Sequence, residues 1–186
     1  IVNSRPVLET LLVAVPNTLM LAIFATLMGF TLGAILGGLA GYYQGSVIDK
    51  LATGFGIAGV SVPHYWLGMV LVVIFAVMLG LLPAMGMGAK GSKTFALDWE
   101  SMKHLILPAI AMSVIPAGII ARSVRGTVAE VLKQDYVQTL YAKGLPSRRV
   151  FIHIMKNAAP TVLAIMGLQL AQLLGGSILI ETVFSW

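Results

Sequence analysis

The sequence predicts an all-α fold, a polytopic bundle of transmembrane helices, and two properties of the chain lead to this class. Of its 186 residues, 58% are hydrophobic and only 10% are charged, whereas soluble domains average about 25% charged residues. The few charges are clustered, which leaves charge-free runs of 39, 39, 18 and 24 residues. A soluble domain of this length cannot bury so much apolar surface, and a disordered chain would carry far more charge. The composition therefore indicates an integral membrane protein.

Each charge-free run contains one predicted span, because about 20 helical residues cross a hydrocarbon core about 30 Å thick. We expect the four spans at residues 18–40, 62–82, 105–121 and 160–180. The two longest runs exceed one span but leave no room for two spans and a turn. Residues 47–60 are therefore interpreted as an interfacial helix or as a lengthened start of the second span. Pro108 and Pro116 mark the third span, and Pro160 is expected to bend the chain or restart the helix at the fourth.

The distribution of lysine and arginine predicts the orientation of the spans, since cytoplasmic loops carry the excess of both. The segment between the third and fourth spans contains seven of them: Arg122, Arg125, Lys133, Lys143, Arg148, Arg149 and Lys156. This segment and the turn at Asp49 and Lys50 are thus expected in the cytoplasm, with both chain ends outside. The opening residues IVNSRPVLET are no signal peptide, so an outside N-terminus predicts an internal fragment of a longer protein.

A ridge of small residues in the first span predicts a close helix contact. Glycine recurs at every fourth position, at Gly29, Gly33, Gly37, Gly41 and Gly45. Small residues at this spacing let two helices approach closely in lipid, where apolar attraction cannot select a partner. We therefore expect another helix to pack against this ridge.

Polar side chains are scarce inside the predicted spans, and three of them are candidates for lining a translocation path: Ser113, Gln169 and Gln172. Gln169 and Gln172 are three residues apart, which places them on one face of a helix. Intramembrane polar groups tend to face a bundle interior or a water-filled path. Hydrogen bonds between helices explain these side chains equally well, so both interpretations stay open.

The residues that most often carry catalytic or metal chemistry form no recognisable constellation. His64, His104 and His153 lie in different segments without metal-ligand spacing, and the chain has no cysteine. The chain also has no Gly-Lys dipeptide, so it contains no phosphate-binding loop of the P-loop type. We therefore predict no metal site, no catalytic residue and no ATP site within this chain.

The segment 122–157 is the one long polar stretch, and it predicts a helix, a tight turn and a second helix projecting into the cytoplasm. An amphipathic helix is expected from the apolar residues at every fourth position, Val128, Leu132, Tyr136 and Leu140. Gly144 stands where a glycine ends such a helix, and Ser147 can cap the second helix. This hairpin either lies on anionic lipid or docks into another protein, and the spacing of its apolar residues slightly favours docking.

The run DYVQTLYAKGLPSRRVFIHIMKNAAP within this segment resembles the EAA loop of binding-protein-dependent ABC importer permeases. More narrowly, it is similar to the dipeptide/oligopeptide/nickel permease family. Flanking strings resemble that family in the same order: SVPHYWLG, GLLPAMG, KHLILPAI and GLQLAQLLGGSILIETVFSW. The resemblance implies a non-enzymatic permease subunit in a bacterial or archaeal inner membrane. It implies one transmembrane domain over 1–186, comprising spans two to five of a six-span type I importer core, with the coupling loop at 122–157.

In that family the EAA loop forms a coupling helix that sits in a cleft of the cytoplasmic ATPase. The resemblance places Gly144 at the motif's glycine and Ile154 at its later isoleucine. Gln138, Thr139 and Leu140 take its Glu-Ala-Ala positions and depart from that general consensus, whereas other positions fit the narrower family. The resemblance therefore implies ATPase contact by Asp135, Tyr136, Gln138, Thr139, Leu140, Ala142, Lys143, Gly144 and Leu145.

The same resemblance implies the partners. A second permease chain, two ATPase chains that bind ATP and Mg, an external substrate-binding protein and the lipid bilayer are expected, and no nucleic acid. The solute would be a peptide, a nickel complex or a related small molecule, delivered by the binding protein. Two other classes remain open: a membrane scaffold that recruits a cytoplasmic partner, and half of a secondary transporter. The latter needs ionisable groups inside its spans, which the charge-free runs argue against.

Overall fold

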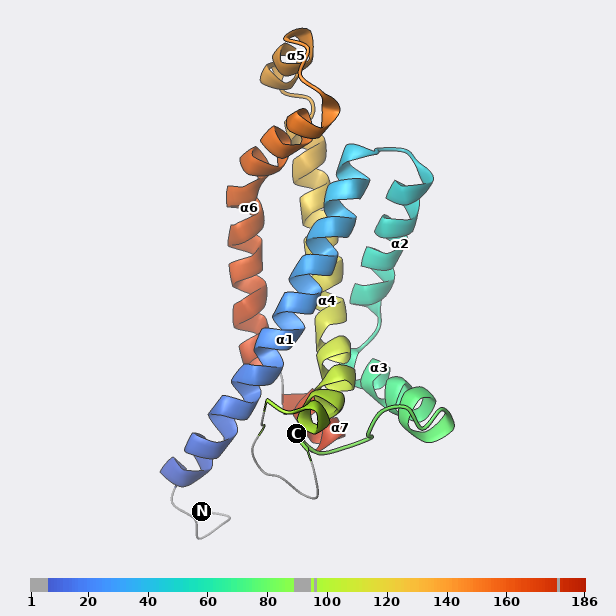
Figure 1. Ribbon diagram of the computed structural model, residues 1–186, viewed down its shortest axis with the longest axis vertical. Helices are drawn as coiled ribbons and strands as arrows, with labels where there is room; N and C mark the ends of the chain where they lie inside the picture. Colours follow the sequence, from blue (N-terminus) through green and yellow to red (C-terminus); the bar gives the residue numbers. More distant parts are fainter. Residues whose placement is uncertain (1–6, 89–94, 96, 177) are drawn as a thin grey trace. The chain divides into compact units, whose positions relative to one another are not determined.

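The computed structural model describes residues 7–88, 95, 97–176 and 178–186, and these residues form helices and no strands. The elements in chain order are α1 (Val7–Tyr42), α2 (Val47–Ser61), α3 (His64–Leu71), the π-helix η1 (Val72–Met78), α4 (Trp99–Val131), α5 (Asp135–Ala142), α6 (Ser147–Gly176) and α7 (Ile178–Phe184) (Figure 1). Among the described residues, α1, α4 and α6 are long and apolar enough to cross a membrane. The broken pair formed by α2 and α3–η1 would make a fourth span. The predicted all-α membrane class is confirmed.

The limits of the predicted spans differ from those of the helices, and the fourth span, expected over 160–180, extends past the end of α6 at Gly176. The first and third spans are parts of α1 and α4, which continue past both predicted ends. Proline does not end these helices, since α4 includes Pro108 and Pro116 and α6 includes Pro160. The second loop helix and the fourth span are therefore one continuous helix, and Pro160 does not restart the chain. A proline removes one backbone hydrogen bond, and in a long helix the remaining bonds and the neighbouring helices hold the segment together.

The limits predicted for the second span, 62–82, are wrong, because the helix there covers only His64–Met78. The helix ends at Ser61 and begins again at His64, with Pro63 in an extended conformation between them. Proline disfavours helix at the residue before it, which accounts for the break at this point. Helices α3 and η1 together contain 15 residues and would extend about 22 Å at most, less than a hydrocarbon core of about 30 Å.

The described residues form two compact units, to both of which α1, α4 and α6 contribute. The first unit comprises Ile1–Met28, Val62–Ser113 and Ala171–Trp186, and the second comprises Gly29–Ser61 and Val114–Leu170. Each is described on its own below.

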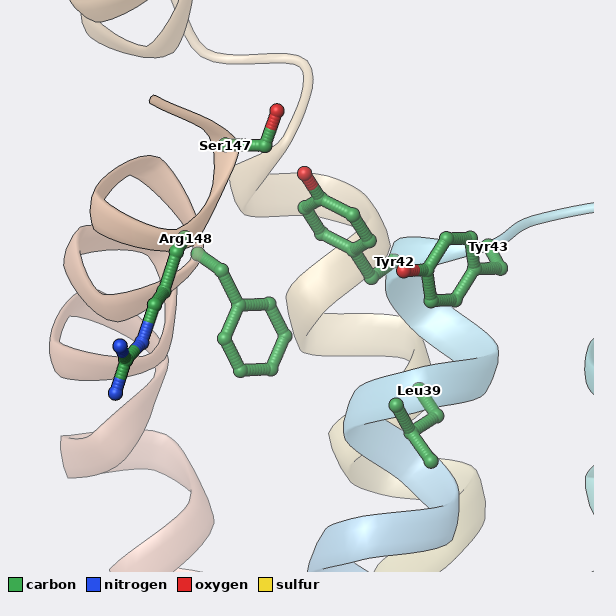
Figure 2. A pocket seen from close by; sticks show the side chains of 6 residues that line it. Leu39, Tyr42, Tyr43, Ser147 and Arg148 are labelled. Atoms are coloured by element: carbon green, nitrogen blue, oxygen red, sulfur yellow. The ribbon is translucent and has the colours of Figure 1, made fainter. Parts of the chain in front are cut away.

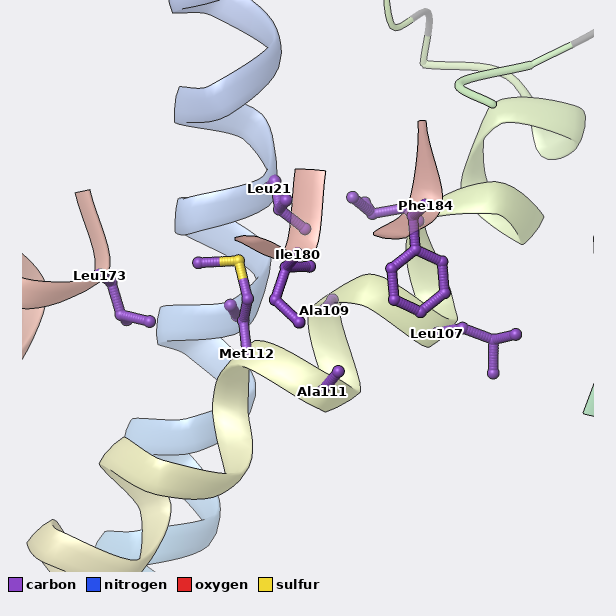
Figure 3. Close-up of a cluster of buried hydrophobic side chains, with 10 residues drawn as sticks. Leu21, Leu107, Ala109, Ala111, Met112, Leu173, Ile180 and Phe184 are labelled. Atoms are coloured by element: carbon purple, nitrogen blue, oxygen red, sulfur yellow. The ribbon is translucent and has the colours of Figure 1, made fainter. Parts of the chain in front are cut away.

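The first unit has a core of apolar side chains from α1, α4, α6 and α7 (Figure 3). Phe184 of α7 fits against Gly68 of α3, where an added Cβ would lie 3.0 Å from the phenylalanine ring. Asn17 joins distant segments of this unit, because its side-chain oxygen accepts the Phe95 N–H at 3.0 Å and its carbonyl accepts the Trp186 indole N–H at 3.2 Å. These bonds tie α1 to Phe95, which precedes α4, and to Trp186, which follows α7.

The second unit is organised around α4, and the predicted glycine ridge of α1 packs directly on it. A Cβ built on Gly33 would lie 2.7 Å from the Ala117 carbonyl oxygen, and one on Gly41 would lie 2.8 Å from the Arg125 carbonyl oxygen. Gly37 is equally close to α4. The expected close contact is thus confirmed for the middle of the ridge. Gly45 lies beyond the end of α1, in a turn with a φ of +75°.

Two further helices cover other sides of α4 in this unit. Helix α2 approaches through Gly56 and Gly59, and a Cβ on Gly118 of α4 would lie 2.7 Å from the Gly56 carbonyl oxygen. Helix α6 packs through larger side chains. Its contact forms a buried apolar cluster with α4 and α5: Ile120, Val124, Val128, Val131, Val137, Val150, Ile154, Ala158 and Val162.

The glycine contact predicts that alanine has different effects on stability at two adjacent positions of α1, Gly37 and Gly38. We expect Gly37→Ala to lower the free energy of unfolding by about 1–3 kcal/mol, because its Cβ would overlap the backbone of α4. Gly38→Ala is the control, since its Cβ would lie at an ordinary 3.6 Å from Met155. That variant should be as stable as the wild type or up to about 1 kcal/mol more stable, from helix propensity. Denaturant unfolding in detergent micelles measures both, and equal values would contradict the predicted contact.

Candidate functional site

The segment between α4 and α6 folds into the short helix α5, flanked by two turns. The predicted amphipathic helix over 128–140 is not continuous, because α4 ends at Val131 and α5 begins at Asp135. The N–H groups of Lys133 and Gln134 bond back to the carbonyls of Glu130 and Val131 at 3.1 Å, which closes the first turn. The apolar residues that suggested one helix therefore lie on two helices, α4 and α5, which pack into the same buried cluster.

Helix α5 is held to the second unit by its apolar side. Val137 is 2% exposed and belongs to the buried cluster with Val128, Val150 and Ile154. Three residues predicted to contact an ATPase also pack against this cluster and are half-buried: Tyr136, Leu140 and Leu145. Sequence reasoning omitted Val137, although its apolar side chain among polar neighbours was the available signal.

The turn after α5 is a Schellman motif centred on Gly144. The Gly144 N–H donates to the Tyr141 carbonyl at 2.9 Å, and the Leu145 N–H donates to the Leu140 carbonyl at 3.2 Å. Gly144 has a φ of +74°, which glycine adopts without steric cost. The predicted role of Gly144 in ending the helix is confirmed. Leu140 and Leu145 both pack on the buried cluster, as the motif's usual hydrophobic contact requires.

The other side of α5 is free of the described core. Six of the nine residues predicted to contact an ATPase are exposed there: Asp135, Gln138, Thr139, Ala142, Lys143 and Gly144. Within the second unit, α5 stands beyond the ends of α4 and α6 (Figure 1). The segment thus presents a short polar surface on a helix whose opposite side is buried.

Aromatic side chains connect α5 to the ends of α1 and α6. The hydroxyl of Tyr42, the last residue of α1, lies 3.3 Å from the hydroxyl of Tyr141 on α5. The Tyr42 ring also contacts Phe151 of α6, with ring centroids 5.2 Å apart and nearly perpendicular planes. Sequence reasoning missed this group, because its members come from three separate segments.

A buried ion pair joins the start of α2 to α4. Arg125 donates to both carboxylate oxygens of Asp49, at 2.5 and 2.8 Å, and Asp49 is 4% exposed. The carboxylate also accepts the Gly45 N–H at 2.9 Å and the Thr53 hydroxyl at 3.3 Å. The pair was not predicted, although the sequence held a signal. Asp49 is the only acidic residue between Glu9 and Asp98, and such a residue needs a partner.

The three candidates for a translocation path lie in different surroundings. Ser113 is buried and its hydroxyl donates to the Ile110 carbonyl of its own helix at 2.9 Å. Gln169 is buried, whereas Gln172 is exposed, so the spacing of three residues does not give them a common environment. Their role in a path stays a prediction. The described residues contain no group of three or more His, Cys, Asp or Glu residues that could hold a metal ion.

Residues 29–186 match the protein family described as the binding-protein-dependent transport system inner membrane component. The chain belongs to this family. It is 40% identical to a dipeptide transport system permease protein of Alkalihalophilus pseudofirmus, over 99% of this chain and 60% of the relative. It is 39% identical to a di/tripeptide transport system permease protein of Pseudomonas aeruginosa, over 92% and 56%. An oligopeptide transport system permease protein of Bacillus subtilis is 32% identical, over 99% and 58%.

Family membership confirms the resemblance that the loop sequence suggested. The matched residues include all of α2 to α7, so the segment 122–157 lies well inside the family match. Membership also agrees with the three apolar helices long enough to cross a membrane. The chain spans about three fifths of the length of these curated relatives.

The ion pair predicts a stability loss when one partner is removed. We expect Arg125→Gln to lower the free energy of unfolding by about 1–3 kcal/mol, because it leaves the buried Asp49 carboxylate without its charged partner. The 36% exposure of the Arg125 side chain keeps the value below that of a fully buried pair. Arg122→Gln makes the same change at an exposed position of α4 and should cost less than about 0.5 kcal/mol.

A double-mutant cycle separates the pair from other effects of the substitution. The Asp49→Asn/Arg125→Gln variant should recover part of the loss, because the uncompensated charge is then gone. Equal unfolding free energies for Arg125→Gln and Arg122→Gln, measured in the same detergent, would contradict the assigned role.

Proposed function

We propose that this chain is the membrane-spanning part of a permease subunit in an ATP-driven importer of peptides. Family membership supports the permease role, and the three relatives above are named for dipeptide, di/tripeptide and oligopeptide transport. These names favour peptides over nickel complexes as the solute. The observation that carries the mechanism is α5, a helix with one side buried in the second unit and the other side exposed.

The proposal includes partner proteins for ATP binding, for the translocation path and for delivery of the peptide. Two cytoplasmic ATPase subunits would bind ATP and Mg, a second permease chain would complete the translocation path, and an external binding protein would deliver the peptide. The exposed side of α5 suits a docking helix, because short amphipathic helices commonly lie in grooves of partner proteins. Its exposed residues would meet the ATPase, while Tyr136, Leu140 and Leu145 would hold the helix from behind.

Movement of the ATPase pair would reach the membrane through the packing of α5. Val137 and its half-buried neighbours share one apolar cluster with α4 and α6, so a displaced α5 pushes on both helices. Helix α6 begins directly after the Gly144 turn and continues without a break to Gly176. A push at its start would therefore act on the part of α6 that packs in the second unit. ATP binding would bias the permease between two states by favouring the one whose α5 position fits the closed ATPase.

The contacts of Tyr42 would also transmit movement of α5 to α1. Because Tyr42 ends α1 and touches both Tyr141 and Phe151, movement of α5 also acts on α1. Helix α1 in turn packs tightly on α4 through its glycines. Within the second unit, α5 thus bears on three helices.

The proposal predicts that Gly144→Val uncouples transport from ATP hydrolysis. Valine at a φ of +74° is strained, so the Schellman turn should open and α5 should lose its fixed position. We expect peptide uptake by the full transporter in proteoliposomes to fall at least about tenfold, while basal ATP hydrolysis persists. Gly167→Val is the control, because Gly167 is exposed on α6 with open space around its Cβ.

Two results would overturn the proposal. Full uptake with Gly144→Val would show that the turn does not couple the subunits. Wild-type ATP hydrolysis that does not respond to the loaded binding protein would favour a scaffold that recruits a partner without transport.

Docking of α5 to the ATPase predicts site-specific crosslinking. The chain has no cysteine, so Gln138→Cys introduces a single thiol on the exposed side of α5. We expect it to crosslink to the ATPase subunit several times more efficiently than Gln44→Cys, on the exposed turn between α1 and α2. Within the second unit, α5 extends beyond that turn (Figure 1). Equal yields at both positions, measured on gels of the assembled complex, would contradict docking through α5.

A further inference from the structure

The second unit contains an open cavity of about 520 Å³ to which the proposed transport cycle assigns no ligand. It lies between the end of α1 and the start of α6, and Figure 2 shows the side chains that line it. Tyr42, Tyr43 and Leu39 come from α1, whereas Ser147, Arg148 and Phe151 come from α6.

The lining combines apolar surface with one positive charge. Leu39 and Phe151 supply apolar surface, and the rings of Tyr42 and Tyr43 meet edge to face with centroids 5.0 Å apart. Arg148 is exposed and forms no ion pair with any acidic side chain of the described residues. The first turn of α6 also contains no acidic residue. The cavity therefore suits a ligand that is anionic at one end and apolar at the other.

The position of the cavity relative to the apolar spans narrows the class of ligand. Helix α1 ends at Tyr42 and α6 begins at Ser147, so both apolar helices have an end at the cavity. Arg148, Arg149 and Lys156 precede the uncharged part of α6, so the cavity lies where charged residues give way to an apolar helix. Tyrosine is enriched at such boundaries, and basic pockets at the cytoplasmic side of helices bind anionic headgroups. The basic residues of 122–157 predict that this is the cytoplasmic side.

We propose that this cavity binds an anionic phospholipid of the cytoplasmic leaflet. The phosphate would pair with the Arg148 guanidinium, because charge-assisted bonds to arginine are strong and geometrically specific. The upper part of an acyl chain would lie against Leu39 and Phe151. This inference goes beyond the proposed function and does not depend on it, since lipid binding is measured without transport.

Native mass spectrometry of the full-length permease in its complex tests the proposal directly. After titration with phosphatidylglycerol or phosphatidylcholine, the wild type should retain phosphatidylglycerol preferentially. Arg148→Gln should lower retained phosphatidylglycerol at least about fivefold, because it removes the charge that pairs with the phosphate. Arg149→Gln is the matched control, with the same charge change at an exposed neighbour that does not line the cavity.

A second variant tests the cavity rather than the charge. Leu39→Trp narrows the cavity from the α1 side and leaves Arg148 in place, so it should also lower retention of phosphatidylglycerol. Full retention with Leu39→Trp would overturn the proposal. Equal losses with Arg148→Gln and Arg149→Gln would overturn it too, because they would indicate diffuse attraction to the basic surface. Equal retention of the two lipids by the wild type would exclude an anionic site.

Discussion

The close approach of α1 and α2 to α4 is the contact on which the second unit depends. In lipid, helices gain nothing by hiding apolar surface from one another, so association rests on fit and on the bonds between them. The glycines of α1 and α2 bring backbone against backbone, at distances where a single methyl group would overlap the α4 carbonyls. Because α4 is fixed in this way, its far end offers a rigid base for the apolar cluster that holds α5.

The segment between α4 and α6 combines this rigid base with an exposed helix. A helix of eight residues is too short to be stable alone, so α5 depends on Val137 and the Schellman turn for its position. Because these contacts fix its position, α5 cannot shift without displacing the side chains of α4 and α6 that pack against it. The same exposed side chains are free to match a partner without disturbing the core.

Sequence reasoning reached the fold class, the glycine contact and the Gly144 turn because each leaves a local pattern. The length of the charge-free runs predicts the spans, and glycine at every fourth position predicts a ridge for helix contact. Gly144, followed by Pro146, predicts the end of a helix. It misplaced the second span because a break at Pro63 does not change hydropathy. It also joined α4 to α5, since an apolar repeat continues through a turn when both helices bury the same side.

What sequence reasoning missed was contact between distant segments. The meeting of Tyr42, Tyr141 and Phe151 depends on the packing of three helices, and no local rule predicts it. The cavity beside them follows from the same packing.

The pairing of Asp49 with Arg125 also sets an order of events during synthesis. The two residues are 76 positions apart, and at about 5–20 residues per second the arginine is made about 4–15 s after the aspartate. During that interval only nearby groups are available to the carboxylate, namely the Gly45 N–H and the Thr53 hydroxyl. The Asp49–Arg125 pair can therefore form only after α4 has been synthesised. The packing of α2 in the second unit is thus completed by a helix that is made after it.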